Sequence, residues 1–272
     1  MTRFRHQLFV GIIFLGVVSA LALMIHAQFS RMLPNYAYLS GWVLFATMVV
    51  LSLYNARKKL PFLPLGNSEA WLQFHVYAGF FTVLLFLIHL NFRVPTGWLE
   101  GTLAWLYFLV TGSGIVGLIL SRVLPRRLST RGGEVIYEKI PALRHALQQS
   151  AEALAFHEGR PSPALAEFYG RRLAAFFSGP RSFWRHLLES RRPLNVVMVE
   201  LEDLRRYLNE QERTRLEKLA QLVRQKDGLD YHYAVQTTLK LWLFVHLPLT
   251  YSLMLFSLLH IVVVFAFSGG AR

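Results

Sequence analysis

Four histidines are the residues of this sequence whose spacing indicates a chemical role. His75 and His89 stand fourteen positions apart, and His246 and His260 repeat that interval. At 3.6 residues per turn, fourteen residues make nearly four turns, so both histidines of a pair face one side of a helix, about 21 Å apart along its axis. Imidazole is a frequent ligand of haem iron and other transition metals. Each pair therefore predicts two metal-ligand positions on one helix face.

The segments that carry these histidines are predicted to cross a membrane. Hydrophobic residues make up 54% of the 272 residues and aromatic residues 14%, which is outside the usual range of soluble proteins. A helix needs about 20 apolar residues to span a bilayer. Stretches of roughly this kind occur at Leu8–Phe29, Leu39–Tyr54, Trp71–Phe92, Thr102–Val123 and Thr238–Phe267. We expect an all-α integral membrane bundle of five transmembrane helices, with the first retained as an anchor because its apolar stretch is too long for a signal peptide.

The order of the spans predicts how the histidines pair. One span separates the third from the fifth, so these two helices cross the membrane in the same direction. His75 then lies level with His246, and His89 level with His260. Two neighbouring helices would present two stacked imidazole pairs, each with room for a flat macrocycle, and haem iron accepts two axial imidazoles. We predict two haem b groups, held by His75/His246 and by His89/His260.

Small residues accompany the predicted ligands. Gly79 and Thr82 share the face of His75 and His89, and Thr250 and Ser257 share the face of His246 and His260. The fourth span adds a track of small residues at Gly112, Gly114 and Gly117. Such a track either packs a helix closely or leaves room for a porphyrin edge. An intramembrane histidine can also serve as a hydrogen-bonding residue between helices, which is our interpretation of His26.

The chain contains no cysteine. Within this chain that excludes structural disulfides, thiolate-bound iron–sulfur clusters and covalently attached c-type haem.

The positions of the basic residues predict the orientation. Arg3 and Arg5 precede the first span and Arg57–Lys59 follow the second, whereas the other short loops carry single arginines. By the positive-inside rule, the N-terminus is cytoplasmic and the tail Ser268–Arg272 lies on the outer side of a bacterial inner membrane. The predicted organisation is then transmembrane helices one to four in residues 1–123, a helical cytoplasmic insertion in 124–236, and the fifth transmembrane helix with a short outer tail in 237–272.

We interpret the predicted insertion as a helical docking module. Pro125 is expected to begin a loop out of the membrane, and Asn195–Lys226 is expected to form one helix that Gly228 ends. There is no dinucleotide fingerprint, phosphate loop or metal-ligand cluster here, and we interpret its histidines as surface or structural residues: His145, His157, His186 and His232. Arg122–Tyr233 holds 20 basic and 14 acidic residues. This mixed charge argues against nucleic acid and favours anionic lipid or an acidic protein partner.

Paired helices with thirteen residues between their histidines, separated by one span, resemble the dihaem four-helix core of the cytochrome b superfamily. That group includes the cytochrome b of quinol-oxidising bc complexes and the membrane domains of ferric reductases and NADPH oxidases. The resemblance covers spans three to five and extends to span two. It implies that His75, His89, His246 and His260 bind two haem b groups. The sequence shows neither a bc-type quinol-site signature nor a flavin and nicotinamide domain after the last span, so the subfamily stays open.

Two axial imidazoles leave the iron no open position, so the expected chemistry is the exchange of single electrons. We expect an electron-transfer subunit of a membrane oxidoreductase complex rather than an enzyme that acts alone. It would link a quinone pool or a cytoplasmic donor to an outer-face partner such as a c-type cytochrome or an iron–sulfur protein, and quinone is a further candidate ligand. Basic residues near either face are candidates to pair with haem propionates: Arg57, Lys58, Lys59 and Arg122 inside, Arg31 or Arg93 outside.

Two alternatives remain open at this level. One is a free-standing transmembrane reductase for ferric iron or quinone. The other is a haem-free membrane anchor whose long cytoplasmic helices recruit a soluble complex.

Overall fold

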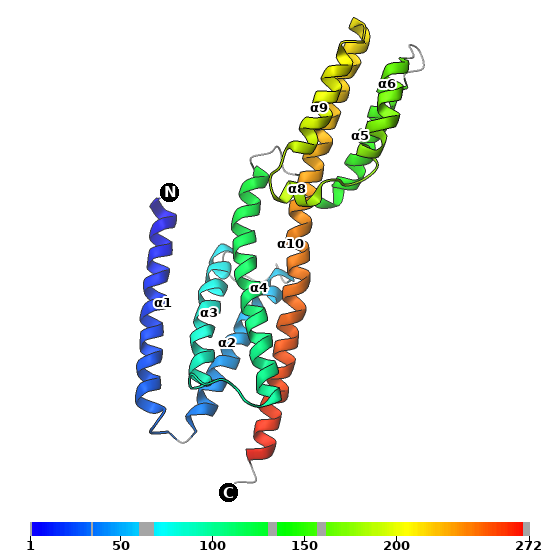
Figure 1. Ribbon diagram of the computed structural model, residues 1–272. Coiled ribbons are helices and arrows are strands. Elements are labelled where there is room, and N and C mark those ends of the chain that lie inside the picture. Colours follow the sequence, from blue (N-terminus) through cyan, green and yellow to red (C-terminus); the bar gives the residue numbers. More distant parts are fainter. Residues whose placement is uncertain (1, 34, 60–67, 130–134, 157–161, 269–272) are drawn as a thin grey trace. The chain divides into compact units, whose positions relative to one another are not determined.

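The computed structural model describes residues 2–33, 35–59, 68–129, 135–156 and 162–268, and these form helices joined by short turns, with no strand among them (Figure 1). This confirms the all-α prediction for the described part of the chain. In chain order the helices are α1 Thr2–Phe29, α2 Tyr36–Lys59, α3 Ser68–His89, α4 Trp98–Ser129, η1 Tyr137–Lys139, α5 Ile140–Ala155, α6 Pro163–Phe168, η2 Tyr169–Leu173, α7 Ala174–Phe177, α8 Phe183–Leu187, α9 Arg192–Arg205 and α10 Glu210–Ser268.

Several of these helices are long and apolar enough to cross a bilayer. Among the described residues, five helices meet this criterion by length and composition: α1, α2, α3, α4 and α10. They carry the five apolar stretches of the sequence. Their surfaces expose many large hydrophobic side chains, such as Phe14, Trp105 and Phe244, which would be costly in water and are expected where the solvent is lipid.

The chain divides into two compact units, and the boundaries fall inside α4 and α10. One unit comprises Met1–Leu118 and Leu243–Arg272, and the other comprises Ile119–Trp242. All four predicted ligand histidines belong to the first unit.

The first unit is a bundle around one apolar core. α2 packs along α3, and α1 contacts α3. The core draws residues from α2, α3, α4 and α10: Leu44, Met48, Leu85, Phe86, Ala104, Tyr107 and Leu253. Within this unit α3 and the final part of α10 run in the same direction, while α2 and α4 run in the opposite one (Figure 1).

α3 ends at His89, three residues earlier than the predicted limit at Phe92. Asn91 and Phe92 both adopt left-handed backbone conformations, with φ of 50° and 56°, which stop a helix. The amide of Phe92 donates to the carbonyl oxygen of Leu87 at 2.9 Å and so caps the helix end. His89 therefore stands in the last turn of α3.

The expectation of one helix over Asn195–Lys226 is wrong. α9 ends at Arg205 and α10 begins at Glu210, because Asn209 and Glu212 form a reciprocal cap. The amide of Asn209 donates to the Glu212 carboxylate at 3.0 Å, and the amide of Glu212 donates to the Asn209 side chain at 2.9 Å. This capping box starts a new helix where the apolar pattern alone suggested continuity.

Gly228 does not end a helix either, since α10 continues through it to Ser268. The residues on both sides of it are held by buried contacts, among them the hydrogen bond from Nζ of Lys226 to the carbonyl oxygen of Gly179 at 2.8 Å. Lys226 and Asp230 are buried and joined by an ion pair of 2.5 Å across one helical turn, and Tyr231 and Val235 are fully buried just beyond. These contacts offset the roughly 1 kcal/mol that a glycine costs in a helix.

Pro125 likewise lies inside a helix, contrary to the expected loop. α4 continues to Ser129. Leu124 is buried with Tyr231 and Val235, and Arg127 donates to the carbonyl oxygen of Leu187 at 2.9 Å. Contacts within the second unit thus hold the last turn of α4 despite the proline.

Candidate functional site

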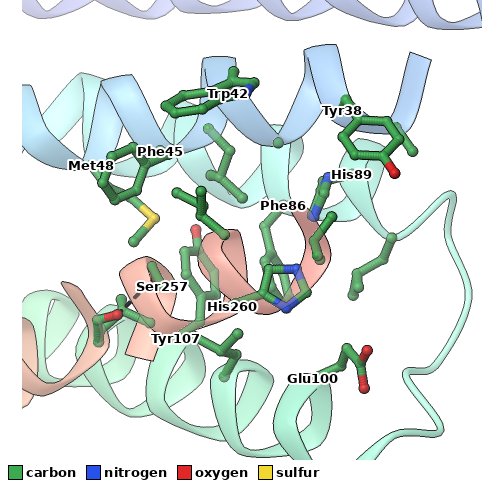
Figure 2. A pocket seen from close by; sticks show the side chains of 18 of the residues that line it. Tyr38, Trp42, Phe45, Met48, Phe86, His89, Glu100, Tyr107, Ser257 and His260 are labelled. Carbon is green, nitrogen blue, oxygen red and sulfur yellow. Dashed lines mark hydrogen bonds between the residues drawn. The ribbon is translucent and has the colours of Figure 1, made fainter. Parts of the chain in front are cut away.

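A cavity in the first unit brings together two of the four predicted histidines. His89 from α3 and His260 from α10, distant in sequence, both line a cavity of about 370 Å³, within the range of about 300–1,000 Å³ that is typical of ligand sites. Figure 2 shows both imidazoles at this cavity, with Phe86 near them and the aromatic side chains of Trp42 and Phe45 on α2 at the same cavity. The site is therefore an apolar chamber with two imidazoles.

The lining is almost entirely apolar and comes from four helices. Its residues are Ala37, Tyr38, Gly41, Trp42, Leu44, Phe45 and Met48 of α2; Phe86 and His89 of α3 with Leu90 after it; Glu100, Leu103 and Tyr107 of α4; and Leu253, Ser257, His260, Ile261, Val264 and Phe265 of α10. Glu100, in the first turn of α4, is the one carboxylate in this lining (Figure 2).

The His89 ring is oriented by Ser40 of α2. The Ser40 hydroxyl donates to the carbonyl oxygen of Ala37 at 3.0 Å, and the same oxygen lies 3.3 Å from Nδ1 of His89. A serine hydroxyl has one proton. The Ala37 carbonyl can take that proton, which leaves the hydroxyl oxygen able to accept from Nδ1–H of His89. In that arrangement the neutral ring carries its proton on Nδ1 and a lone pair on Nε2, the tautomer that binds a metal through Nε2.

Gly41, the next residue, lies directly against the same ring. A Cβ atom at this position would come within 2.8 Å of Cε1 of His89, much closer than the 3.5–4.0 Å of an ordinary contact. Only a glycine lets α2 approach the imidazole this closely, so the ring is held between a hydroxyl and bare backbone.

The other end of the bundle repeats this arrangement at His246. The Ser113 hydroxyl of α4 lies 3.0 Å from Nδ1 of His246. Gly114 follows, and a Cβ there would lie 3.8 Å from Cε1 of the same ring. Because α10 is continuous from His246 to His260, the two serine-contacted levels of the bundle are about 21 Å apart along the helix axis.

His75 lies at the same axial distance from His89 on α3 and packs on an aromatic side chain. Its ring centroid is 5.1 Å from that of Tyr54 on α2, at an interplanar angle of 36°. Neither His75 nor His246 lines the cavity of His89 and His260. One turn from His75, a Cβ added to Gly79 would meet nothing within 4 Å, so this position leaves room beside α3.

A packed layer separates the two histidine levels. Phe86 and Tyr107 stack with ring centroids 4.1 Å apart, and Tyr107 donates its hydroxyl to Thr82 at 3.0 Å. All three side chains are buried. Thr82, which the sequence places on the ligand face, thus serves this layer and does not bind at either histidine level.

The residues of this cavity fit a planar metal macrocycle with two axial imidazoles. His89 can present its Nε2 lone pair, the surroundings are apolar, and a second histidine, His260, lines the same cavity. In the described part of the chain, no group of three or more His, Cys, Asp or Glu side chains could hold a bare metal ion. A haem requires only two protein ligands because its four equatorial nitrogens belong to the macrocycle.

The remaining candidates from the sequence lie elsewhere. His26 contacts the rings of Tyr36 and Phe92, at centroid distances of 5.4 and 5.8 Å. Arg31, Arg93 and Arg122 are exposed, and the side chains of Arg57, Lys58 and Lys59 lie outside the described residues. In the second unit, His145 is exposed, His186 and His232 are buried, and His157 lies outside the described residues.

Sequence reasoning missed Ser40 and Ser113 as partners of the histidines. No role was predicted for Ser40, Gly41 or Ser113, and Gly114 was interpreted only as part of the small-residue track of the fourth span. A signal was present: the dipeptide Ser-Gly occurs in the second and in the fourth predicted span, at Ser40-Gly41 and at Ser113-Gly114.

Comparison of the chain with protein-family models, with characterised proteins and with solved structures finds no match.

Proposed function

We propose that this chain is a dihaem cytochrome b subunit of the inner membrane, which carries electrons across the bilayer. The observation that carries the proposal is the cavity that His89 and His260 share. Two imidazoles from different helices at one apolar chamber are what a bis-histidine haem requires, and a haem b supplies single-electron exchange when bound.

The second predicted pair, His75 and His246, would hold a second haem at the other level of the bundle. The support is the equal fourteen-residue spacing on two helices that run in the same direction, together with the serine contact that His246 shares with His89. In this proposal all five apolar helices cross the membrane, and the second unit is cytoplasmic.

The protein's own residues have three roles in this function. His75, His89, His246 and His260 bind the iron. The apolar lining, with Trp42 and Phe86, excludes water from the cavity. The packed layer of Phe86 and Tyr107 keeps the two levels separate. Two histidines at each haem would leave no coordination position for a substrate, so we expect electrons to pass to and from separate redox partners. These would be a c-type cytochrome or an iron–sulfur protein on the outer side, and quinone or a soluble donor as the other partner.

Haem content of purified full-length protein tests the proposal. We expect reduced-minus-oxidised spectra of low-spin haem b and two haems per chain. His260→Ala and His75→Ala should each retain one haem, and His145→Ala, an exposed histidine of the second unit, should retain two. Wild-type protein without haem or iron, purified from cells that supply haem, would refute the proposal and leave the haem-free anchor.

A second measurement separates a subunit from a reductase that acts alone. Isolated protein should become reduced or oxidised with chemical mediators but should not turn over quinol or a ferric chelate unaided. Sustained turnover without partners would instead identify a free-standing reductase.

A further inference from the structure

We propose that Ser40 and Ser113 are positioning residues. Ser40 fixes the protonation and orientation of His89 in one predicted pair, and Ser113 does the same for His246 in the other pair. The inference depends on the proposed haem function, because the serines would act on the midpoint potential and g values of the bound haems. It adds two residues, on α2 and α4, to a site predicted from α3 and α10 alone.

The first step is the repetition of one pattern at two separate places. Ser40 contacts Nδ1 of His89 at 3.3 Å and Ser113 contacts Nδ1 of His246 at 3.0 Å. In both cases the next residue is glycine and lies against Cε1 of the same ring. The two contacts involve different helices and different histidines, so one local accident of packing does not explain both.

The second step is the direction of the hydrogen bond at His89. Ser40 is buried, with 7% of its surface exposed, and the carbonyl oxygen of Ala37 is an acceptor for its proton at 3.0 Å. A ring that binds iron through Nε2 carries its proton on Nδ1, so the Ser40 oxygen is then the acceptor for Nδ1–H. A partner at Nδ1 fixes the tautomer, turns the ring and raises the basicity of Nε2.

The third step is the distribution over the predicted pairs. His89 belongs with His260, and His246 belongs with His75, so each haem would have one serine-oriented ligand. The serine-oriented ligands lie on different helices, α3 and α10. Ser40 and Ser113 should thus act on different haems, and a serine variant should affect one haem and leave the other unchanged.

The sign of the effect follows from ligand basicity. A more basic imidazole stabilises ferric iron relative to ferrous iron. Removing the hydroxyl acceptor should therefore raise the midpoint potential of the haem that the histidine binds. A tenfold change in the ratio of the site's affinities for ferric and ferrous haem corresponds to about 59 mV in the midpoint potential for one electron. Loss of a hydrogen-bond partner of a ligating histidine commonly lowers metal affinity about 10–100-fold.

Redox titration and electron paramagnetic resonance of full-length Ser40→Ala and Ser113→Ala test the proposal. We expect Ser40→Ala to raise the potential and shift the largest g value of the haem that His260→Ala removes, and Ser113→Ala to do the same for the haem that His75→Ala removes. Ser40→Thr retains a hydroxyl and should restore both values. Ser257→Ala is the matched control, since Ser257 lines the same cavity but bonds the carbonyl oxygen of Leu253 at 2.8 Å.

The outcomes separate this inference from the proposed function. If wild-type protein binds two haems and both serine variants retain wild-type potentials and g values, while losing only thermal stability, the serines are structural and the inference is wrong. If wild-type protein binds no haem, the proposed function fails. The inference at His89 is then still tested by imidazole ¹⁵N resonances, which should show the Nδ1–H tautomer in wild-type protein and lose it in Ser40→Ala; an unchanged tautomer would overturn it.

Discussion

Substitution of Gly41 by alanine measures how tightly α2 holds His89. The new Cβ would meet Cε1 of His89 at 2.8 Å, so the ring or the helix must move by about 1 Å to reach an ordinary contact of 3.5–4.0 Å. Overpacking of this kind costs about 1–3 kcal/mol. The gain in helix propensity, about 1 kcal/mol, offsets part of that cost. We expect a net destabilisation of about 0–2 kcal/mol and a displaced imidazole.

Gly114 provides the matched substitution at the other level. A Cβ there would lie 3.8 Å from Cε1 of His246, which is a normal van der Waals distance. Gly114→Ala should therefore leave the ring in place and have little effect on stability.

Haem retention distinguishes the two variants. Both proteins are purified in detergent under identical conditions, and haem per chain is measured before and after dialysis against an apo-protein acceptor of haem. We expect Gly41→Ala to lose the haem of the His89 level about 10–100 times more readily and to keep the other one. Equal retention in Gly41→Ala, Gly114→Ala and wild type would refute the close approach of α2 to His89 on which the site depends.

Three further predictions concern the second unit. Asp230→Asn, which leaves the buried Lys226 and the partly buried Arg144 without the Asp230 carboxylate, should cost about 3–5 kcal/mol in denaturant unfolding. Lys226→Met should cost less because Arg144 still pairs with Asp230. Asn209→Ala removes the cap of α10 and should lower unfolding free energy by about 0.5–2 kcal/mol; an unchanged denaturant midpoint would contradict the cap. Burial lowers the pKa of His232 in the folded protein. Its neutral form therefore stabilises the fold at pH values above the unfolded pKa of about 6.5, and this stabilisation is lost as the pH falls through the folded pKa. His232→Phe should flatten the fall in melting temperature with acidification, and parallel curves would exclude this role.

The long helices were predictable because their signal is local. Apolar stretches of about 20 residues are visible in the sequence, and the ends of α1, α2, α3 and α4 lie within about six residues of the ends of these stretches. The shared cavity of His89 and His260 needed more than local pattern, namely equal spacing and a common direction for the two helices. Both of those follow from counting residues and spans.

The errors arose where tertiary contacts override local propensity. Pro125 and Gly228 are breakers in isolation, but Leu124, Tyr231 and Val235 form a buried cluster that keeps both flanking helices intact. The opposite error occurred at Asn209, where a cap divides an apolar pattern that looked continuous.

The serine partners of the histidines could not be predicted for a different reason: the sequence shows these residues but not that they contact the histidines. His75 and His89 share a helix, so helical geometry alone predicts their relative position. Ser40 and His89 belong to different helices, and their contact depends on how α2 lies against α3 and on the absence of a side chain at Gly41. Helix packing of this kind is selected by small residues at the crossing point. A Ser-Gly dipeptide in a membrane helix, where a hydroxyl and a point of close approach are adjacent, is therefore a feature to search for opposite any predicted axial histidine.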